Sequence, residues 1–304
     1  MLSVTFLGTG AACPTVERNV AALAVHREGE MLLFDCGEGT QRQMMRYGVG
    51  FSFREVFFTH YHSDHVLGIT GLLRTLGLQN RLEKITLYGP RPAERILGAL
   101  LSVGVERTRF PIEIVELKPG DVLSRREYDI NIFATDHRAD TVGYALVESD
   151  RLGRFDPEQA KALGVPEGVL WGRLHRGEKV TLEDERVIDP ALLVGPPRPG
   201  RTLVYAGDTR PATAVVEAAR GADLLVHEAT FGDDEVDRAT ETGHSTARQA
   251  AQVAQEAGVR QLALTHISAR YSRDAPELAA EAREVFPDTV VARDGMTIAI
   301  PFQP

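Results

Sequence analysis

The chain has 304 residues, of which 43% are hydrophobic, and its formal net charge at pH 7 is −9. This length suits one large α/β domain with an insertion better than two ordinary domains. The negative charge argues against a protein that coats nucleic acid non-specifically, and no apolar stretch approaches the roughly 20 residues of a membrane span.

The N-terminal segment MLSVTFLGTG lacks the charged, apolar and small-residue regions of a secretory signal peptide. The two cysteines, Cys13 and Cys36, cannot form a disulfide framework, and their spacing is not that of zinc ligands. We therefore expect a cytoplasmic protein whose thiols lie in or near the core. We also expect neither a membrane nor DNA as a partner.

Apolar runs of strand length recur along the whole chain. In order they are LSVTFLG, AALAVH, MLLFDCG, EVFFTH, KITLYG, INIFATDH, YALVE, TLVYAGD, DLLVHEA, QLALTH and TIAIPF. Between some of them, apolar residues return every three or four positions, which predicts helices over 65–78, 92–103, 212–220, 245–257 and 275–285. Strands that alternate with helices in both halves predict a layered α/β fold with sheet inside and helices outside.

Residues 151–197 interrupt this alternation. The segment is rich in Gly and Pro, has no long amphipathic pattern and contains the only tryptophan, Trp171. Over the slightly longer stretch 151–201, nine Lys and Arg residues outnumber eight Asp and Glu residues, so the stretch carries +1 and the rest of the chain −10. We interpret it as an inserted arm, the relatively basic part of an acidic protein. Composition alone allows an ordinary surface excursion equally well.

The densest chemical signal is an H-x-H-x-D-H pattern directly after an apolar run. Its members are His60, His62, Asp64 and His65. Imidazole nitrogens suit zinc and manganese-like ions, and a carboxylate adds a hard ligand that neutralises charge. Because one ion takes about four ligands, a second ion or more distant ligands are implied.

Three more candidates, His137, Asp208 and His266, each follow a strand-like run. Sites in α/β folds assemble at strand ends of this kind. An isolated histidine beside a strand is more often structural, but the repeated context favours ligands. We predict two ions, one bound by His60, His62 and His137, the other by Asp64, His65 and His266, with Asp208 as a bridge. Two ions about 3.5 to 4 Å apart suit in-line hydrolysis of a phosphodiester.

These residues lie in longer segments that resemble a known family. FLGTGAACPTVERN, FFTHYHSDHVLGITGLL, GDTRP, VHEATF, GHSTARQAA and LTHISARY are together similar to the ribonuclease Z (tRNase Z) family of the metallo-β-lactamase superfamily. The first metal motif alone would be shared with lactamases, thioesterases and sulfatases. The resemblance implies an α/β fold of the four-layer αββα sandwich type. It also implies an endoribonuclease that cleaves precursor tRNA 3′ of the discriminator nucleotide, leaving a tRNA 3′-OH and a 5′-phosphorylated trailer.

The same resemblance implies catalytic roles. Asp64 would accept a proton from the attacking water, His244 of ETGHST would donate one to the leaving 3′-oxygen, and Glu228 of VHEATF would be the partner of His244. The structural alternative is that His244 merely precedes a helix capped by Ser245 or Thr246, and that Glu228 makes a plain hydrogen bond.

The segment PTVERN resembles the family's P-x-K-x-R-N loop, which lies near the cleavage site and is linked to sensing the CCA end. Pro14, Arg18 and Asn19 match, whereas Val16 stands where lysine is expected. This departure removes one phosphate-binding side chain and puts the rejection of CCA-bearing precursors in question. Arg270 of THISARY could approach the scissile phosphate, or form a plain surface salt bridge.

The arm resembles the family's flexible exosite, which grips the tRNA elbow. Arg173, Arg176 and Lys179 would supply salt-dependent phosphate contacts without reading bases. The family's Gly-Pro tip is altered here to PEGVLW. In relatives the arm of one subunit serves the active site of the other, so the resemblance implies a homodimer.

Two other functions share some of these features. A small-molecule phosphodiesterase or lactonase of the same superfamily would use the same metals without needing the arm. A protein that only binds RNA would hold structural metals and would be indifferent to His244. Mixed nitrogen and oxygen ligands accept both Zn²⁺ and Mn²⁺, so the ligand set does not decide which of the two ions is bound.

Overall fold

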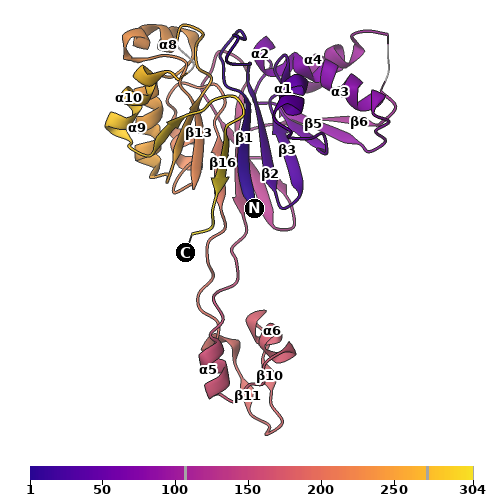
Figure 1. Ribbon diagram of the computed structural model, residues 1–304, viewed down its shortest axis with the longest axis vertical. Coiled ribbons are helices and arrows are strands. Elements are labelled where there is room, and N and C mark those ends of the chain that lie inside the picture. Colours follow the sequence, from indigo (N-terminus) through magenta and orange to yellow (C-terminus); the bar gives the residue numbers. More distant parts are fainter. Residues whose placement is uncertain (106–107, 272–273, 304) are drawn as a thin grey trace. The chain divides into compact units, whose positions relative to one another are not determined.

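The computed structural model describes residues 1–105, 108–271 and 274–303. They form two compact units (Figure 1). The main unit comprises residues 1–147 and 201–301, and the arm unit comprises residues 148–200 with Phe302 and Gln303.

The first sheet of the main unit has seven strands in the order β16-β1-β2-β3-β4-β5-β6, and all but the C-terminal β16 come from the N-terminal half of the chain. The strands β16, β1, β2 and β3 pair antiparallel, whereas β3 to β6 pair parallel. Their bounds are β1 (Leu2–Gly8), β2 (Ala22–Arg27), β3 (Glu30–Phe34), β4 (Glu55–Phe57), β5 (Ile85–Pro90), β6 (Ile112–Leu117) and β16 (Thr297–Ile300).

A second seven-stranded sheet has the order β15-β14-β13-β12-β9-β8-β7. Strands β12 to β15 pair parallel, and β12 pairs antiparallel with β9. Their bounds are β7 (Val122–Ser124), β8 (Tyr128–Ala134), β9 (Val142–Glu148), β12 (Thr202–Tyr205), β13 (Leu224–Glu228), β14 (Leu262–Thr265) and β15 (Thr289–Val291).

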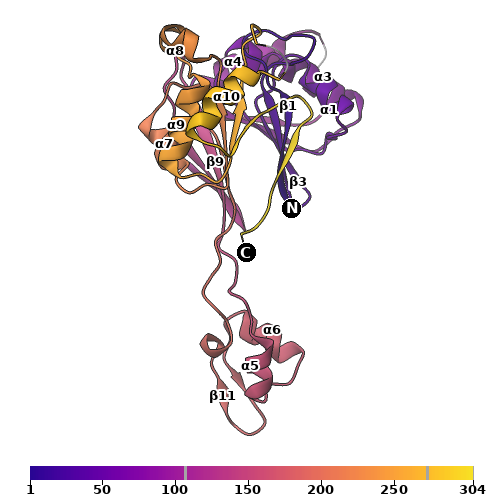
Figure 2. The same cartoon turned by 60° about the vertical axis from the view of Figure 1, so that its left-hand side comes forward.

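Helices cover the outer face of each sheet (Figures 1 and 2). Those packed on the first sheet include α1 (Thr40–Arg46), α3 (Gly68–Leu78) and α4 (Ala93–Ser102), and those on the second include α7 (Thr213–Ala218), α9 (Ala247–Ala257) and α10 (Pro276–Val285). The inner faces share an apolar core in which Phe57 stacks on Phe34 and Tyr88, with ring centroids 5.0 and 4.8 Å apart. The four-layer αββα sandwich, the metallo-β-lactamase fold, is therefore confirmed.

The single helix predicted over 65–78 is divided in the structure at Leu67. The structure has α2 (Ser63–Val66) and then α3, which begins at Gly68. A Cβ at Gly68 would lie 2.0 Å from the carbonyl oxygen of Gly37, so only glycine lets the helix start so close to the loop after β3. Helices α1 and α8 (Val236–Thr242) have no counterpart in the predicted set.

The arm unit has a small core of its own. It contains α5 (Pro157–Ala162), α6 (Val169–His175), the short antiparallel pair β10 (Val180–Thr181) and β11 (Val187–Ile188), and the 3₁₀ turn η1 (Pro190–Leu192). Ala160, Leu174 and Val180 are among its buried residues, and the indole of Trp171 donates to the carbonyl of Val165 at 3.0 Å. In the part of the chain that the structure describes, every helix is too short or too polar to span a bilayer.

Candidate metal centre

The seven predicted ligands come from strand ends that are distant in sequence, and the structure brings them together. His60 and His62 lie in the loop after β4, while Asp64 and His65 lie on α2. His137 follows β8, Asp208 follows β12 and His266 follows β14. Their ligand atoms form two groups, each with all its atoms within 4.8 Å of one another: His60, His62, His137 and Asp208, and Asp64, His65 and His266.

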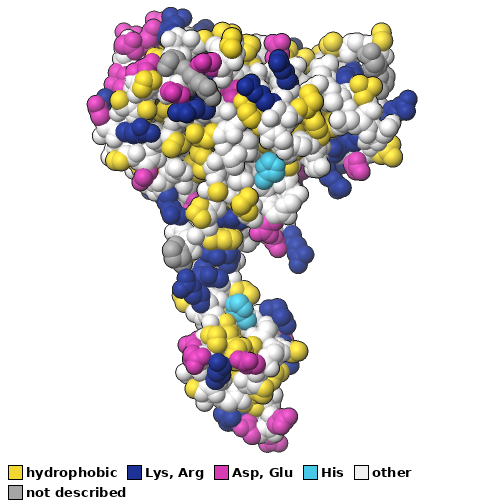
Figure 3. Space-filling model, viewed as in Figure 1, with side chains coloured by type: hydrophobic (Ala, Val, Ile, Leu, Met, Phe, Trp, Pro, Cys, Tyr) yellow, Lys and Arg dark blue, Asp and Glu magenta, His cyan; other side chains and the backbone are white. Residues whose placement is uncertain are grey.

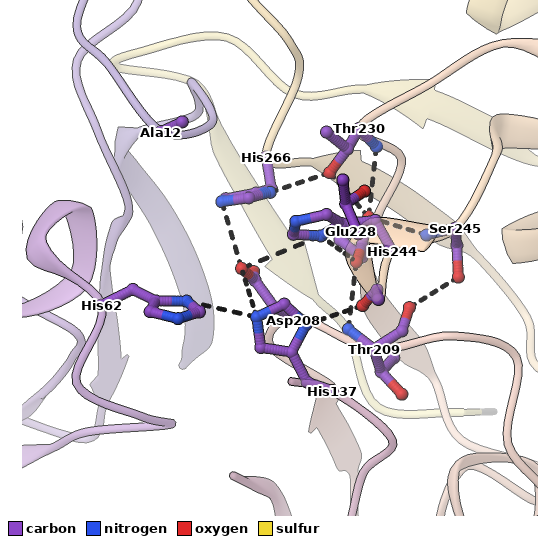
Figure 4. Close-up of polar contacts among 12 residues, drawn as sticks. Ala12, His62, His137, Asp208, Thr209, Glu228, Thr230, His244, Ser245 and His266 are labelled. Atoms are coloured by element: carbon purple, nitrogen blue, oxygen red, sulfur yellow. Dashed lines mark hydrogen bonds and ion pairs between the residues drawn. The ribbon is translucent and has the colours of Figure 1, made fainter. Parts of the chain in front are cut away.

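Asp208 lies between the two groups (Figure 4). Its Oδ2 is 3.7 Å from His60 Nε2, 3.4 Å from His65 Nε2 and 3.3 Å from His266 Nε2. Its Oδ1 is buried and has no hydrogen-bond partner among the described residues. A buried carboxylate oxygen without a donor is expensive unless a cation satisfies it, so this position fits a metal ligand.

The imidazole nitrogens also converge on one another. His62 Nδ1 lies 2.9 Å from His60 Nε2 and 3.2 Å from His137 Nε2, and His65 Nε2 lies 3.3 Å from His266 Nε2. Two neutral ring nitrogens facing each other can form at most one hydrogen bond, but both lone pairs can bind a cation. The convergence therefore favours a divalent metal site, which the four-layer fold also indicates.

Four of the rings are anchored on the side away from the site. The outward bonds are His60 Nδ1 to Thr59 Oγ1 (3.0 Å), His65 Nδ1 to Asp35 Oδ2 (2.9 Å), His137 Nδ1 to the Gly243 carbonyl (2.6 Å) and His266 Nδ1 to Thr230 Oγ1 (2.9 Å). Such partners fix the tautomer and leave the inward nitrogen for the metal.

Asp35 was not among the predicted site residues. It is fully buried and accepts from the Thr59 backbone N–H, the Thr59 hydroxyl and the Tyr205 hydroxyl, in addition to its bond with His65. The available signal was an acidic residue at the end of the apolar run MLLFDCG, the same context that singled out Asp208.

The electrostatics suit cation binding. Burial lowers the pKa of His60, His62 and His137, which keeps these rings neutral and their lone pairs available. Burial also acts to lower the pKa of His65, but the carboxylates of Asp208 and Asp35 outweigh it and raise that pKa. A cation that binds His65 must therefore displace a proton.

His244 and Glu228 lie beside this cluster. His244 Nδ1 is 2.8 Å from Glu228 Oε1 and 3.9 Å from Asp208 Oδ2, and its ring stacks on that of His266. Burial acts to lower the pKa of His244, but the Glu228 carboxylate outweighs burial and raises it to about 9. His244 is therefore protonated at neutral pH, next to the candidate metal ligands.

Glu228, at the end of β13, is held by more than His244. Its oxygens accept from the backbone N–H groups of Thr209, Thr230 and Ser245, at 3.0 to 3.2 Å, and from the Thr230 hydroxyl at 2.7 Å. Burial alone would raise its pKa, but the charge of His244 lowers it, so the carboxylate stays ionised.

Of the two capping candidates, Thr246 is the one that caps α9, through a reciprocal pair of bonds with Gln249.

The three residues of PTVERN that match the family loop differ in how far they are exposed to solvent. Pro14 is exposed, and Asn19 donates through Nδ2 to the carbonyl of Glu38 at 2.9 Å. Arg18 is only 3% exposed, and its Nη1 donates to Thr9 Oγ1 and to the Ala292 carbonyl, both at 2.7 Å. In this structure the Arg18 guanidinium faces the interior and offers no surface to a substrate. Val16 is fully exposed.

The other proposed substrate-binding cations lie at the surface and form ion pairs. Arg270 pairs with Glu235, which is the surface salt bridge considered as its alternative. In the arm unit, Arg173 and Arg176 pair with Glu178 at 2.9 and 3.5 Å, and Lys179 pairs with Asp189 at 3.0 Å. Exposed pairs of this kind are worth at most about 1 kcal/mol, so phosphates can compete for these cations.

Comparison with known proteins places the chain among nucleases. The family model described as Anti-Pycsar protein Apyc1 matches residues 2–153, and the one described as Beta-lactamase superfamily domain matches residues 183–267. The ribonuclease Z of Gemmatimonas aurantiaca is 59% identical, over 98% of this chain and 96% of its own. That of Myxococcus xanthus is 56% identical, over 100% of this chain and 99% of its own.

A solved structure agrees with these relatives. The crystal structure of the short form of human tRNase Z has a TM-score of 0.71 and 27% identity, and covers 99% of this chain and 100% of its own. Because the similarity runs through both units from end to end, we conclude that the chain belongs to the ribonuclease Z family, the endoribonucleases of tRNA 3′-end processing.

Proposed function

We propose that the chain cleaves precursor tRNA 3′ of the discriminator nucleotide, leaving a tRNA 3′-OH and a 5′-phosphorylated trailer. The observation that carries this proposal is the His244–Glu228 pair beside the candidate metal ligands. Cleavage on this side of the phosphate makes a ribose 3′-oxygen the leaving group. This oxygen departs poorly as an alkoxide, so an acid at this position is what the reaction needs.

The two groups of ligands suit two divalent ions, Zn²⁺ or Mn²⁺, with Asp208 shared between them. His60, His62 and His137 would hold one, and Asp64, His65 and His266 the other. When bound, such ions lower the pKa of water and relieve negative charge on the phosphate.

Asp64 is the proposed acceptor for the proton of the attacking water. Its Oδ2 accepts from the Ala12 backbone N–H at 2.8 Å and lies 3.3 Å from His266 Nε2. Burial acts to raise the pKa of Asp64, but His266 and His65 outweigh it and lower that pKa. The carboxylate is thus ionised and able to orient a water molecule.

His244 is the proposed proton donor to the leaving 3′-oxygen. A positioned general acid contributes roughly 10²- to 10⁴-fold to the rate. Glu228 stabilises the protonated ring and fixes its orientation through the Nδ1 bond, which leaves Nε2 as the nitrogen that can face the substrate. Glu228 itself is saturated with donors and needs no contact with RNA.

Substrate binding is assigned to two regions. In the arm unit, Arg173, Arg176 and Lys179 are proposed to contact phosphates at the tRNA elbow, as in the exosite that residues 151–197 resemble. In the main unit, Pro14, Asn19 and Arg270 are proposed to lie near the cleaved end. Arg18 was predicted as a further substrate contact, but its side chain is buried. It would instead support substrate binding by holding the conformation of its loop. We also propose a cytoplasmic homodimer.

Incubation of purified protein with precursor tRNA tests the proposal. Precursors with and without encoded CCA should both be tested, each with Zn²⁺ and with Mn²⁺. The precursor without CCA should yield product ends directly 3′ of the discriminator. Mapped ends elsewhere, or turnover of bis(p-nitrophenyl) phosphate without any cleavage of precursor tRNA, would instead favour a small-molecule hydrolase.

A further inference from the structure

A loop from residue 9 to residue 19 connects the first two strands and contacts the candidate metal centre. Its Ala12 donates a backbone N–H to Asp64 Oδ2 at 2.8 Å, and Figure 4 shows Ala12 among the site residues. Ala12 has φ of 61°, in the left-handed region that alanine seldom occupies. Such a conformation persists only where surrounding contacts enforce it. The rest of the loop must therefore hold Ala12 on Asp64.

Backbone bonds close this loop and attach it to the chain after His266. The N–H of Gly10 donates to the carbonyl of Asn19 at 2.8 Å. The N–H of Ala11 donates to Ile267, and that of Ile267 donates back to Thr9, at 3.0 and 2.8 Å. The loop thus bridges two candidate ligands, Asp64 through Ala12 and His266 through its neighbour in the chain.

One side chain, Asp294 in the turn before β16, joins both ends of the loop. Its Oδ1 accepts from the Thr9 hydroxyl at 2.7 Å, and its Oδ2 accepts from the Asn19 backbone N–H at 2.6 Å and from Gln43 Nε2 at 2.7 Å. The buried Arg18 guanidinium, bonded to the same Thr9 hydroxyl, requires a nearby negative charge. Asp294, which lies outside the loop, makes the largest electrostatic contribution of the carboxylates that act on Arg18.

We infer that Asp294 is a positioning residue for the metal centre: it closes the 9–19 loop, which holds the Ala12 N–H on Asp64 Oδ2 and fixes the orientation of that carboxylate. The inference rests on the proposed function insofar as Asp64 acts at the metal centre. It also means that the buried Arg18, through its bond to the Thr9 hydroxyl, stabilises the loop from inside.

The substitution Asp294→Asn tests the inference. An amide has one oxygen where the carboxylate has two, so it cannot accept from Thr9, Asn19 and Gln43 together. Loss of a partner that orients a ligand typically lowers metal affinity or activity by 10- to 100-fold. We expect a fall of about this size in Zn²⁺ affinity of the metal-free protein, by competition with a chromophoric chelator. The kcat for bis(p-nitrophenyl) phosphate should fall with little change in KM.

Two further variants keep the test decisive. Arg293→Gln alters the neighbouring, exposed side chain that pairs with Asp274, and should match wild type in both readouts. Thr9→Val leaves the Asp294 charge beside Arg18 and removes only the bonds of the Thr9 hydroxyl. It should give a smaller fall in the same direction, and it decides the matter if Asp294→Asn does not fold.

Thermal unfolding and active-site titration separate positioning from stability. If folded Asp294→Asn binds Zn²⁺ and turns over the diester as Arg293→Gln does, the inference is overturned. It is equally overturned if activity falls only in proportion to the unfolded fraction. If wild type fails to cleave precursor tRNA while Asp294→Asn still binds Zn²⁺ more weakly, the proposed function fails and the inference stands.

Discussion

The main unit and the arm unit use charged side chains in opposite ways. In the main unit Asp35, Asp208 and Glu228 are at most 2% exposed and lie within hydrogen-bonding or metal-binding distance of histidines. In the arm unit the cations of Arg173 and Lys179 lie at the surface in exposed ion pairs. Figure 3 shows Lys and Arg side chains beside Asp and Glu side chains on the face of the arm unit in view.

This difference separates two kinds of contribution. A buried charge is oriented by its partners and is costly to leave unpaired, so it can fix a reactive geometry. An exposed pair contributes little to stability and can exchange its partner for a phosphate. Changes in the buried set should therefore alter kcat and metal binding, whereas changes in the arm unit should alter RNA affinity.

The largest effect is expected for His244→Ala. Removing the acid that protonates the leaving 3′-oxygen should lower kcat for precursor tRNA by roughly 10²- to 10⁴-fold. The affinity for RNA, measured by filter binding, should stay near that of wild type. A variant with unchanged kcat would mean that His244 has a structural role only, as in a protein that merely binds RNA.

Glu228→Gln should have an intermediate effect that depends on pH. Glu228 raises the pKa of His244 to about 9, and the acid form of the ring is present below that pKa and lost above it. Glutamine removes the largest contribution that raises the pKa of His244, so this pKa falls and the alkaline limb of kcat shifts to lower pH. Near pH 8 the kcat of the variant should be roughly 10- to 100-fold below that of wild type.

The exposed Glu284, which pairs with Arg248, provides the control for this prediction. Glu284→Gln should leave the pH profile of kcat in place. An unshifted alkaline limb in Glu228→Gln would show that Glu228 acts on His244 by packing alone.

Neutralising the arm cations should weaken binding without affecting the chemistry. The triple substitution of Arg173, Arg176 and Lys179 by Gln should reduce the slope of log K against log salt by about 1 for each phosphate that the arm no longer binds. Turnover of bis(p-nitrophenyl) phosphate should be unchanged. Glu183→Gln, an exposed change in the same unit, should leave the slope as it is. Unaltered binding of precursor tRNA by the triple variant would contradict the exosite assignment.

The smallest effect is expected for Val16→Lys. Val16 is fully exposed, so the change should alter the free energy of unfolding by less than about 0.5 kcal/mol. The lysine restores the residue expected in the P-x-K-x-R-N loop and should add about one unit of salt slope for precursor tRNA. Equal salt slopes for the two proteins would show that this position does not reach a phosphate.

Apolar runs that alternate with amphipathic helices predict a layered α/β fold, whereas the four-layer αββα arrangement was implied only by the family resemblance. They also selected the candidate ligands, since each one ends or follows such a run. The patterns did not reveal the roles of Asp35 and Asp294, because those roles depend on partners distant in the chain. The resemblance of PTVERN to the family's loop made Arg18 a candidate substrate contact. Its burial depends on contacts with Thr9 and Ala292 and on the nearby Asp294, which the loop motif does not show.

Metal content tests the central claim most directly. Elemental analysis of protein purified without added metal, combined with cleavage assays before and after treatment with a strong chelator, should be made on wild type and Asp208→Ala. We predict about two divalent transition-metal ions per wild-type chain, loss of cleavage on chelation and recovery with Zn²⁺ or Mn²⁺, and depletion of both ions in the variant. Wild-type protein that contains no transition metal and still cleaves precursor tRNA in excess chelator would contradict the account.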